Sequence, residues 1–328
     1  MDLPALLHLA ARIADDVLFP AALAVDRADR VPAGHLDLLA EKGFYGLAGP
    51  PEYGGVTDAL AHRVTETLAS GCLATAFVWV QHHGAVRAAA GAPPPIRDAW
   101  LEPLCRGRRR AGVVLAALRP GPASVRATAV PGGYRLDGAA PWVTGWELVD
   151  TLLTAARLDD GTVVWALLDA VASPSLRFTL LDPVAVVASR TGNLRFDGHF
   201  VPDERVAGTM PYADWPARDA AGLRGNGSLA LGVVARCCRL MGPGPFDTEL
   251  SWCRDALDAA GPEALPAARA AASELAVRAA AALTVHTGSR AILRDDHAQR
   301  LVREAAFLLV FGTRPGIRDA LRARLHPR

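Results

Sequence analysis

Lysine is almost absent from this chain of 328 residues: Lys42 is the only one, so nearly all of the positive charge is carried by arginine. The 35 basic residues are balanced by 34 acidic ones, which gives a formal net charge of +1. Such a balance lacks the electrostatic footprint that binding of a polyanion requires. We therefore expect no nucleic-acid partner, and we attribute the arginine bias, together with the frequent Ala, Gly and Pro, to the codon usage of a GC-rich genome.

Cysteine is also scarce, and its spacing excludes two classes of protein. The five cysteines are Cys72, Cys105, Cys237, Cys238 and Cys253. Their number is odd and no CxxC pair occurs, which fits neither a disulfide framework nor a zinc site. We therefore predict no metal centre and a reducing, cytoplasmic environment.

Charge is missing from one long stretch, Thr67 to Val86, "TLASGCLATAFVWVQHHGAV". Its twenty residues reach the length of a membrane helix. It also contains polar groups, among them Gln81, His82 and His83, which would be costly in the hydrocarbon of a bilayer. The N-terminal sequence "MDLPALLHLAARIADD" lacks the basic segment and the small-residue cleavage site of a secretory signal. We expect a buried helix of a soluble domain and no membrane association.

The hydrophobic content of 51% is enough for more than one core. Apolar residues recur at helical spacing up to about residue 108, give way to short, partly alternating runs separated by Gly, Pro and Asp, and then return to helical spacing. This pattern predicts an α+β multi-domain fold: an N-terminal helical domain over 1–108, a middle antiparallel, barrel-like β domain over 109–214 and a C-terminal helical bundle over 215–328.

Alanine is concentrated in the predicted bundle. Ten alanines lie between Ala267 and Ala282, which favours helix and allows neighbouring helices to approach closely.

Four sequence motifs occur in a characteristic order. They are "LAEKGFYGLAGPPEYGG" (39–55), "YRLDGAAPWVTGWELVDTLLTAAR" (134–157), "FDGHFVPDERV" (196–206) and "HAQRLVREAAFLLVFGT" (297–313). In this order they resemble the acyl-CoA dehydrogenase superfamily, of which the chain looks like a short, divergent member with a shortened bundle. The resemblance implies a flavin-dependent oxidoreductase that uses FAD, takes a small-molecule substrate such as an acyl thioester and forms oligomers.

The resemblance assigns two residues of the β domain to the flavin. It implies that Trp142 lies against the isoalloxazine ring and that the hydroxyl of Thr144 bonds near the reactive nitrogen. An aromatic plane covers the ring and a fixed hydrogen bond tunes the acceptor, while the cofactor carries the redox chemistry. The alternative is that Trp142 is an ordinary cross-strand residue of the β core.

The phosphate side of the expected FAD site departs from the family. An acidic and a Gly-Ser element of relatives are replaced by Ala117-Leu118-Arg119 and Pro122-Ala123. Arg254 is the nearest match to the arginine that reaches the flavin diphosphate, and Gly288 with Arg290 is the counterpart of the adenine-side loop. A guanidinium matches phosphate geometry, but Arg290 is equally compatible with a solvated arginine at a helix end.

The general base of the family is missing at its usual place. Most relatives keep a glutamate just before the Gly-Thr of the last motif, and here that position is Phe311. Other relatives carry the glutamate on the first bundle helix, where this chain has Gly232. We predict that Phe311 is a packing residue, and that if a base exists it is Glu304 or His297.

Other titratable residues near these motifs have structural interpretations as well. Glu304 stands where the family has an aspartate, and we expect it to pair with Arg300 or Arg303 at helical spacing. His82, His83 and His286 could titrate near neutral pH, or could be structural or surface histidines.

Three functions remain open from the sequence. The first is a flavin-dependent oxidoreductase whose base has moved or is not needed. The second is a non-catalytic subunit that completes the site of a related dehydrogenase. The third is an enzyme similar to the reduced-flavin monooxygenases of the same fold. The shortened bundle and its apolar faces predict a homo-oligomer or a hetero-oligomer with a homologous chain.

Overall fold

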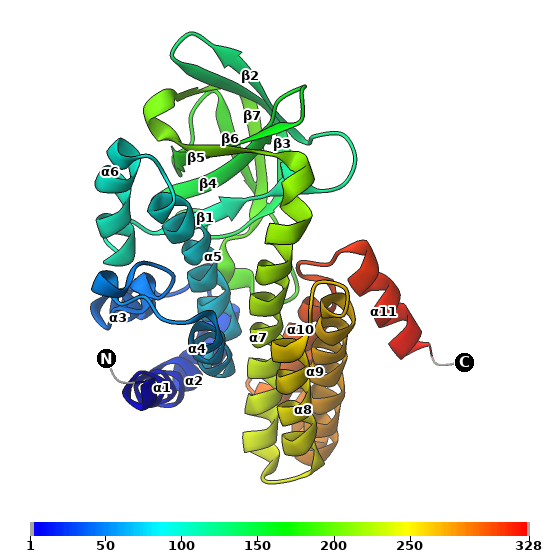
Figure 1. The fold of residues 1–328 in the computed structure, drawn as a ribbon. Coiled ribbons are helices and arrows are strands. Elements are labelled where there is room, and N and C mark those ends of the chain that lie inside the picture. Colours follow the sequence, from blue (N-terminus) through cyan, green and yellow to red (C-terminus); the bar gives the residue numbers. More distant parts are fainter. Residues whose placement is uncertain (1–2, 327–328) are drawn as a thin grey trace.

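The computed structural model describes residues 3–326 and has three parts in chain order: helices, a sheet and helices again. Figure 1 shows the sheet at one end of the molecule, with the N-terminal and the C-terminal helices beneath it. Helix α7 runs from the sheet into the C-terminal helices and so connects these two parts. The predicted α+β class and the order of its parts are confirmed.

The N-terminal part contains six α-helices and short helical turns. They are α1 (Leu3–Arg12), the π-helix η1 (Ile13–Leu18), α2 (Phe19–Arg27), α3 (Ala33–Glu41), η2 (Phe44–Gly46), η3 (Pro51–Tyr53), α4 (Asp58–Gly71), α5 (Leu73–Ala90) and α6 (Pro94–Cys105). The uncharged stretch 67–86 is buried as predicted, but it belongs to two helices that meet at Cys72. Among the residues described, no helix combines the length and the apolarity that a membrane crossing needs.

The middle part is one eight-stranded sheet in the order β6-β7-β3-β2-β4-β5-β8, with β1 beside β4. Its elements are β1 (Ala111–Val114), η4 (Ala116–Leu118), β2 (Val125–Val130), β3 (Gly133–Val143), β4 (Thr151–Arg157), β5 (Thr162–Asp169), β6 (Leu176–Leu180), η5 (Val187–Ser189), β7 (Gly192–Pro202), η6 (Asp203–Arg205), β8 (Val206–Pro211) and η7 (Tyr212–Asp214).

The sheet is mixed rather than wholly antiparallel. Strand β4 pairs in parallel with β1 over four residues and with β2 at one position, whereas the other pairings are antiparallel. The prediction of an antiparallel domain was therefore wrong for the pairings of β4 with β1 and β2, and right for its pairing with β5. Alternation of apolar and polar residues along a strand indicates which side chains face the core. It does not indicate which strand lies alongside, and a parallel neighbour is connected through a long stretch of chain that no local pattern reveals.

The C-terminal part consists of α7 (Trp215–Met241), α8 (Pro245–Ala259), α9 (Leu265–Thr287), η8 (Gly288–Ile292), α10 (His297–Val310) and α11 (Pro315–Leu325). The alanine-rich helix α9 lies in the centre and packs against α7, α8, α10 and α11, with most of its inward alanines fully buried. Helix α8 has 15 residues, against 27 in α7 and 23 in α9.

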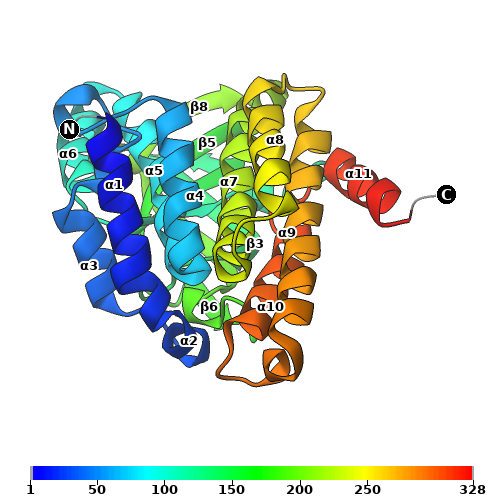
Figure 2. The same cartoon turned by 90° about the horizontal axis from the view of Figure 1, so that it is seen from below.

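The two helical parts share one core. Figure 2 shows α1, α4 and α5 beside α7 to α10, and a single buried apolar cluster runs through both sets of helices. At their contact, a Cβ on Gly232 of α7 would lie 2.5 Å from the carbonyl oxygen of Glu66 and 2.6 Å from the Cβ of Ala69. Close packing against α4 therefore leaves no room for a side chain at Gly232.

Candidate functional site

A β-bulge at the end of β3 sets the geometry around Trp142. Ala140 of β3 is opposite Leu194 of β7, but Val143 is opposite Gly192, so one extra residue has entered β3 between these two pairs. Trp142 adopts a φ of 62°, in the left-handed region that a bulky residue rarely occupies. Its side chain is 57% exposed. Trp142 is therefore directed out of the sheet and is not a residue of the β core.

The same bulge brings two threonines together. Continuing the shifted register by one residue places Thr144 opposite Thr191, and their Oγ1 atoms are 3.0 Å apart. The Thr191 hydroxyl also lies 2.8 Å from the Oγ of Ser189. Thr144, Thr191 and Ser189 are 4%, 5% and 0% exposed. We call these three residues the hydroxyl chain.

The loops that carry the hydroxyl chain are strained and bound to each other. Glu147, Val186 and Arg190 have φ values of 63°, 51° and 53°, and none of them is a glycine. The backbone N–H of Gly145 donates to Ser189 O at 2.9 Å. Left-handed residues outside glycine cost about 1–3 kcal/mol each and cluster at functional sites. This concentration of strain marks the 142–147 and 186–191 loops as a candidate site.

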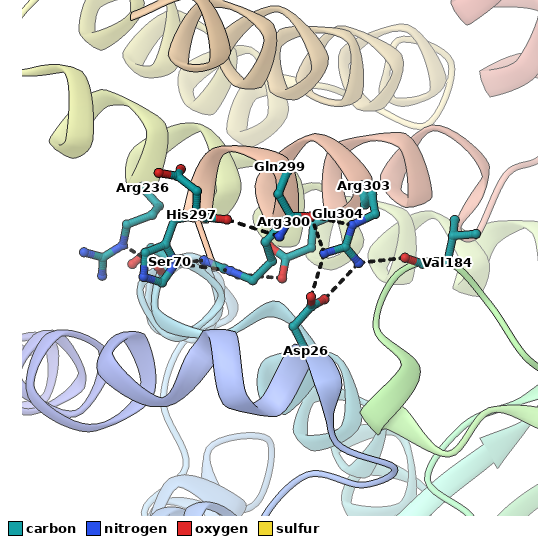
Figure 3. A network of polar contacts seen from close by, with 10 residues as sticks. Asp26, Ser70, Val184, Arg236, His297, Gln299, Arg300, Arg303 and Glu304 are labelled. Atoms are coloured by element: carbon teal, nitrogen blue, oxygen red, sulfur yellow. Dashed lines mark hydrogen bonds and ion pairs between the residues drawn. The ribbon is translucent and has the colours of Figure 1, made fainter. Parts of the chain in front are cut away.

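The candidate site lies where the three parts of the molecule meet. Val186 and Ala188 belong to the core of the helices, and the N–H of Val31, which follows α2, donates to Ala188 O at 2.8 Å. From α10, Arg303 donates to Val184 O at 2.8 Å and forms a two-bond ion pair with Asp26 at 3.0 and 2.6 Å. Figure 3 shows Arg303 between Asp26 and Val184. The position of the 186–190 loop is thus fixed by both sets of helices.

Phe311 directly follows α10 and packs in an aromatic cluster with Phe77 and Phe307. Its ring centroid lies 4.9 Å from that of Phe77 at an edge-on angle of 81°, and 5.4 Å from that of Phe307 with the planes 19° apart. Phe77 belongs to α5 and is buried. These contacts are those of the packing residue that the sequence predicts.

A buried arginine holds the backbone next to Phe311. Arg269 of α9 is 1% exposed and donates to the carbonyl oxygens of Leu308 and Phe311, each at 3.5 Å, and to the hydroxyl of Ser273. Burial lowers its pKa to about 10. Within the described residues it has no carboxylate partner. The cation compensates the carbonyl-rich C-terminal end of α10.

Glu304 and His297 lie in the polar network of Figure 3. Arg300 donates to Glu304 Oε1 at 2.6 Å, which confirms the expected ion pair. Burial raises the pKa of Glu304, although the Arg300 charge acts in the opposite direction. The other carboxylate oxygen, Oε2, is buried without a partner among residues 3–326. The candidate base Glu304 is therefore enclosed between α10 and the N-terminal helices.

His297 is held in one tautomer by the same arginine. Arg300 lies 3.2 Å from His297 Nδ1 through Nη2, and since a guanidinium can only donate, Nδ1 must accept and Nε2 must carry the proton. The ring stacks on Phe19 at 4.1 Å. Burial and then the Arg300 charge lower the pKa of His297 to about 4. Its one free lone pair is thus already used within the chain.

Arg254, Gly288 and Arg290, the residues predicted for the phosphate side, belong to the C-terminal helices and not to the loops 142–147 and 186–191. Arg254 of α8 forms a two-bond ion pair with Glu66 of α4 at 3.0 and 2.6 Å, and both side chains are largely buried. Gly288, with a φ of 74°, begins η8, and Arg290 is exposed on the same turn. A diphosphate role for these residues stays a prediction, and at Arg254 a phosphate would have to compete with the Glu66 carboxylate.

The buried pair His82 and His83 is structural. The N–H of Ala111 donates to His82 Nδ1 at 3.1 Å, and His82 Nε2 donates to Leu104 O at 3.1 Å. His83 Nε2 donates to Phe44 O at 3.3 Å. Neither ring is oriented for acid–base chemistry. His286 is exposed at the end of α9.

Sequence reasoning missed Ser189, Thr191 and Arg269. The first two precede β7 in "ASRTGN", an ordinary turn sequence, and only the register of the bulge shows that they meet Thr144. Arg269 lies among alanines, and no local pattern indicates that it is buried against the end of α10.

Comparison with known proteins agrees with this architecture. The family model "Acyl-CoA dehydrogenase, N-terminal domain" matches residues 2–108. Benzylmalonyl-CoA dehydrogenase of Aromatoleum aromaticum is 28% identical over 202 residues, which are 59% of this chain and 54% of that protein. The aligned part spans about half the length of the curated relatives that the chain matches.

Solved structures match the whole fold. Butyryl-CoA dehydrogenase from Megasphaera elsdenii superimposes with a TM-score of 0.84 at 17% identity, covering 99% of this chain and 100% of that one. PigA with FAD and proline gives a TM-score of 0.83 at 18% identity, covering 99% of both chains. At such identities these matches establish the fold alone. Residues 2–108 thus match the N-terminal domain of acyl-CoA dehydrogenases, and the whole chain is similar in fold to the solved structures of butyryl-CoA dehydrogenase and PigA.

Proposed function

We propose that the chain binds FAD with its ring system against Trp142 and Thr144, and that it acts as an oxidoreductase on a small molecule of the acyl thioester class. The observation that carries the proposal is the bulge at the end of β3. It exposes 57% of a large aromatic side chain while it fixes the hydroxyl of a residue two positions later. An exposed aromatic plane beside a fixed hydroxyl matches the needs of a flat, polar-edged cofactor.

In this proposal the cofactor supplies a two-electron acceptor, and the chain supplies the surroundings. The indole of Trp142 covers one face of the ring system and displaces water from it. The Thr144 hydroxyl offers a hydrogen bond at the ring edge. The strained loops 142–147 and 186–191 keep both groups in position, because each loop is hydrogen-bonded to the other and to the helices.

The phosphate side offers weaker support for FAD. Arg290 and Gly288 are on an exposed turn, where a diphosphate or adenine could reach the guanidinium and the adjacent N–H groups. Arg254 is already neutralised by Glu66. We therefore expect FAD to bind more weakly than in relatives with complete phosphate motifs.

None of the three candidate positions, Phe311, Glu304 and His297, offers an accessible, unoccupied proton acceptor for removal of an α-proton. Phe311 has no acceptor, Glu304 is buried against Arg300, and the Nδ1 lone pair of His297 is occupied by the same arginine. A positioned general base is worth typically about 10²–10⁴ in rate. We expect dehydrogenation of simple acyl-CoAs to be slow by about that factor.

A second function, a non-catalytic subunit that completes the site of a related dehydrogenase, is favoured by the packing of Phe311. An aromatic side chain wedged between Phe77 and Phe307 fills space that a substrate-binding site would leave open. The third reading, a reduced-flavin monooxygenase, needs no base at position 311.

The test is a titration of the purified chain with FAD and with FMN, followed by flavin absorbance and fluorescence. Trp142→Ala is expected to weaken FAD binding at least tenfold, about 1.4 kcal/mol. Trp252→Ala is a matched control, because Trp252 is also exposed but lies on α8. A wild-type chain that binds neither flavin at high micromolar concentration would refute the oxidoreductase proposal.

Two further measurements separate the three functions once binding is found. Reduction of bound FAD by an acyl-CoA in the absence of oxygen supports the dehydrogenase class. Oxygen consumption in the presence of reduced flavin supports the monooxygenase class. Bound flavin that supports neither reaction supports the partner subunit.

A further inference from the structure

The hydroxyl chain contains three hydroxyl groups but only two hydrogen bonds. Each hydroxyl has one hydrogen to donate and two lone pairs that accept. Two contacts, Ser189 Oγ to Thr191 Oγ1 at 2.8 Å and Thr191 Oγ1 to Thr144 Oγ1 at 3.0 Å, use two of the three hydrogens. One hydrogen is left over, and its location decides what the chain of hydroxyls can do.

Because Ser189 is fully buried, its hydroxyl hydrogen is not the one left without a hydrogen-bond acceptor. Ser189 is 0% exposed, and within the described part of the chain its hydroxyl has no contact other than Thr191. If Ser189 accepted from Thr191, its own O–H would be buried without an acceptor, which costs about 1–3 kcal/mol. Ser189 therefore donates to Thr191.

The direction of the second bond follows from the first. If Thr144 also donated to Thr191, the Thr191 hydrogen would be the spare one. Among the described residues neither Thr191 nor Thr144 has a further acceptor, so the direction follows from cooperativity between the two hydrogen bonds. A head-to-tail chain, in which Thr191 accepts from Ser189 and donates to Thr144, strengthens each bond by polarising its neighbour. In that arrangement the spare hydrogen belongs to Thr144, at the end of the chain beside Trp142.

We infer that Ser189 and Thr191 are positioning residues that make the Thr144 hydroxyl an obligate hydrogen-bond donor toward the edge of a bound flavin. This inference rests on the proposed function, because it requires a flavin against Trp142 and Thr144. Neither Ser189 nor Thr191 has to touch the cofactor. They act through Thr144 by occupying one of its lone pairs with an incoming hydrogen and so turning its own hydrogen outward.

A donor at the ring edge has a measurable consequence. Reduction makes the ring system richer in electrons, so a hydrogen bond donated to it stabilises the reduced form more than the oxidised form. Loss of the ordered donor should therefore make the midpoint potential of the bound flavin more negative. A purely structural role of Thr191 would change protein stability and leave the potential where it was.

The experiment measures the midpoint potential and the absorption spectrum of FAD bound to the full chain. Thr191→Val keeps the shape but removes the hydroxyl, and it is expected to lower the ratio of reduced to oxidised flavin about tenfold, which is about 30 mV for a two-electron couple. Thr191→Ser retains the hydroxyl and should restore the wild-type potential. Thr151→Val is the matched control, because Thr151 is a fully buried threonine of β4 whose hydroxyl has no partner among residues 3–326.

The outcomes separate this inference from the proposed function. A wild-type chain that does not bind FAD overturns both. FAD binding with equal potentials in wild type and Thr191→Val overturns the inference alone, as does a Thr191→Ser variant that behaves like Thr191→Val. If Thr191→Val does not fold, Ser189→Ala tests the same direction of hydrogen bonding from the Ser189 end of the hydroxyl chain. We expect a smaller shift of the midpoint potential with the same sign. An unchanged potential would refute the inference.

Discussion

Phe311 has the contacts of a packing residue. Its ring is in contact with Phe77 of α5 and Phe307 of α10, and the carbonyl of the same residue receives a hydrogen bond from the buried Arg269. The side chain therefore ties the end of α10 to the N-terminal helices. A carboxylate at this position would lose those contacts but would lie near a buried cation that lacks a carboxylate partner.

The first prediction concerns the chemistry at this residue. With FAD, a dye acceptor and straight-chain acyl-CoAs, Phe311→Glu is expected to raise the rate of dehydrogenation about 10²-fold or more over wild type, because it supplies a general base. Phe307→Glu is the control, since it places a carboxylate in the same aromatic cluster at another position. Wild-type turnover above about 1 s⁻¹, a common enzyme rate, would show that a base is already present elsewhere.

At the scale of single elements, helix α5 depends on two uncharged histidines. Burial lowers the pKa of His83 to about 4 and that of His82 well below its ordinary value. Protonation of His82 at Nδ1 would also break the hydrogen bond that this atom accepts from Ala111 N–H. In the unfolded chain both histidines are protonated below their ordinary pKa of about 6.5, whereas in the folded state they stay neutral to a lower pH.

The second prediction is the resulting pH dependence of stability. Because the pKa values are lower in the folded state, the stabilisation is complete above about pH 6.5 and is lost as the pH falls from there toward about 4, by on the order of 3 kcal/mol for His83. Urea unfolding at several pH values measures it. His83→Gln should reduce the slope, whereas His286→Gln, at an exposed histidine, should not; an equal slope in all three proteins would contradict the assignment.

Close packing of α7 against α4 limits which side chain can occupy position 232. A Cβ at Gly232 would meet the backbone of α4, which cannot yield in the way that a flexible side chain can. Gly222, in the same helix, has no atom within 4 Å of such a Cβ. The two glycines therefore form a matched pair that differs in packing but not in secondary structure.

The third prediction uses that pair. Gly222→Ala is expected to stabilise the protein by about 0.5–1 kcal/mol, because alanine favours the helix. Gly232→Ala is expected to destabilise it by about 1–3 kcal/mol, because overpacking outweighs the propensity. Chemical denaturation gives both values. Equal effects of the two substitutions would mean that the α4–α7 contact can open.

On the scale of the whole molecule, partly buried ion pairs of arginine hold the helical parts together. Arg254 with Glu66 joins α8 to α4, and Arg303 with Asp26 joins α10 to α2. Both contacts cross between segments that the sequence predicts as separate domains. Together with the shared apolar core, they make the first and last parts one packed unit beneath the sheet.

Apolar surface remains at one end of this unit. Val285, Ile292 and Leu293, at the end of α9 and along η8, are 82%, 80% and 51% exposed. This surface comes from the end of α9 and from η8. Five alanines of the alanine-rich part of α9 are buried against neighbouring helices: Ala270, Ala272, Ala276, Ala279 and Ala280. Clustered exposed apolar side chains of this kind are typical of interaction surfaces.

The fourth prediction is that the chain forms an oligomer through these residues. Light scattering at tens of micromolar should report a dimer or larger species, and Ile292→Glu should shift it toward monomer because a charge would be buried at the contact. Val171→Glu is the control, since Val171 is similarly exposed in the sheet part. A well-folded wild-type monomer would exclude homo-oligomerisation and leave a heterologous chain as the partner.

The sequence by itself determined the order of the three parts and most helices, because helical periodicity is a property of neighbouring residues. It also predicted that Glu304 pairs with Arg300 or Arg303, and the structure shows the pair with Arg300, four residues away on the same face of the helix. The packing of Phe311 could be expected from an aromatic residue after an apolar helix, whereas its placement at the family's base position stays a prediction.

Only the tertiary structure decided what depends on contacts between distant segments. The parallel pairing of β4, the engagement of Arg254 by Glu66 and the contact of Gly232 with α4 each join residues separated by tens to more than a hundred positions. The hydroxyl chain is the clearest case. A single inserted residue at the bulge changes which side chains of β3 and β7 face each other, so Thr144 meets Thr191 only because the strands pair in that register.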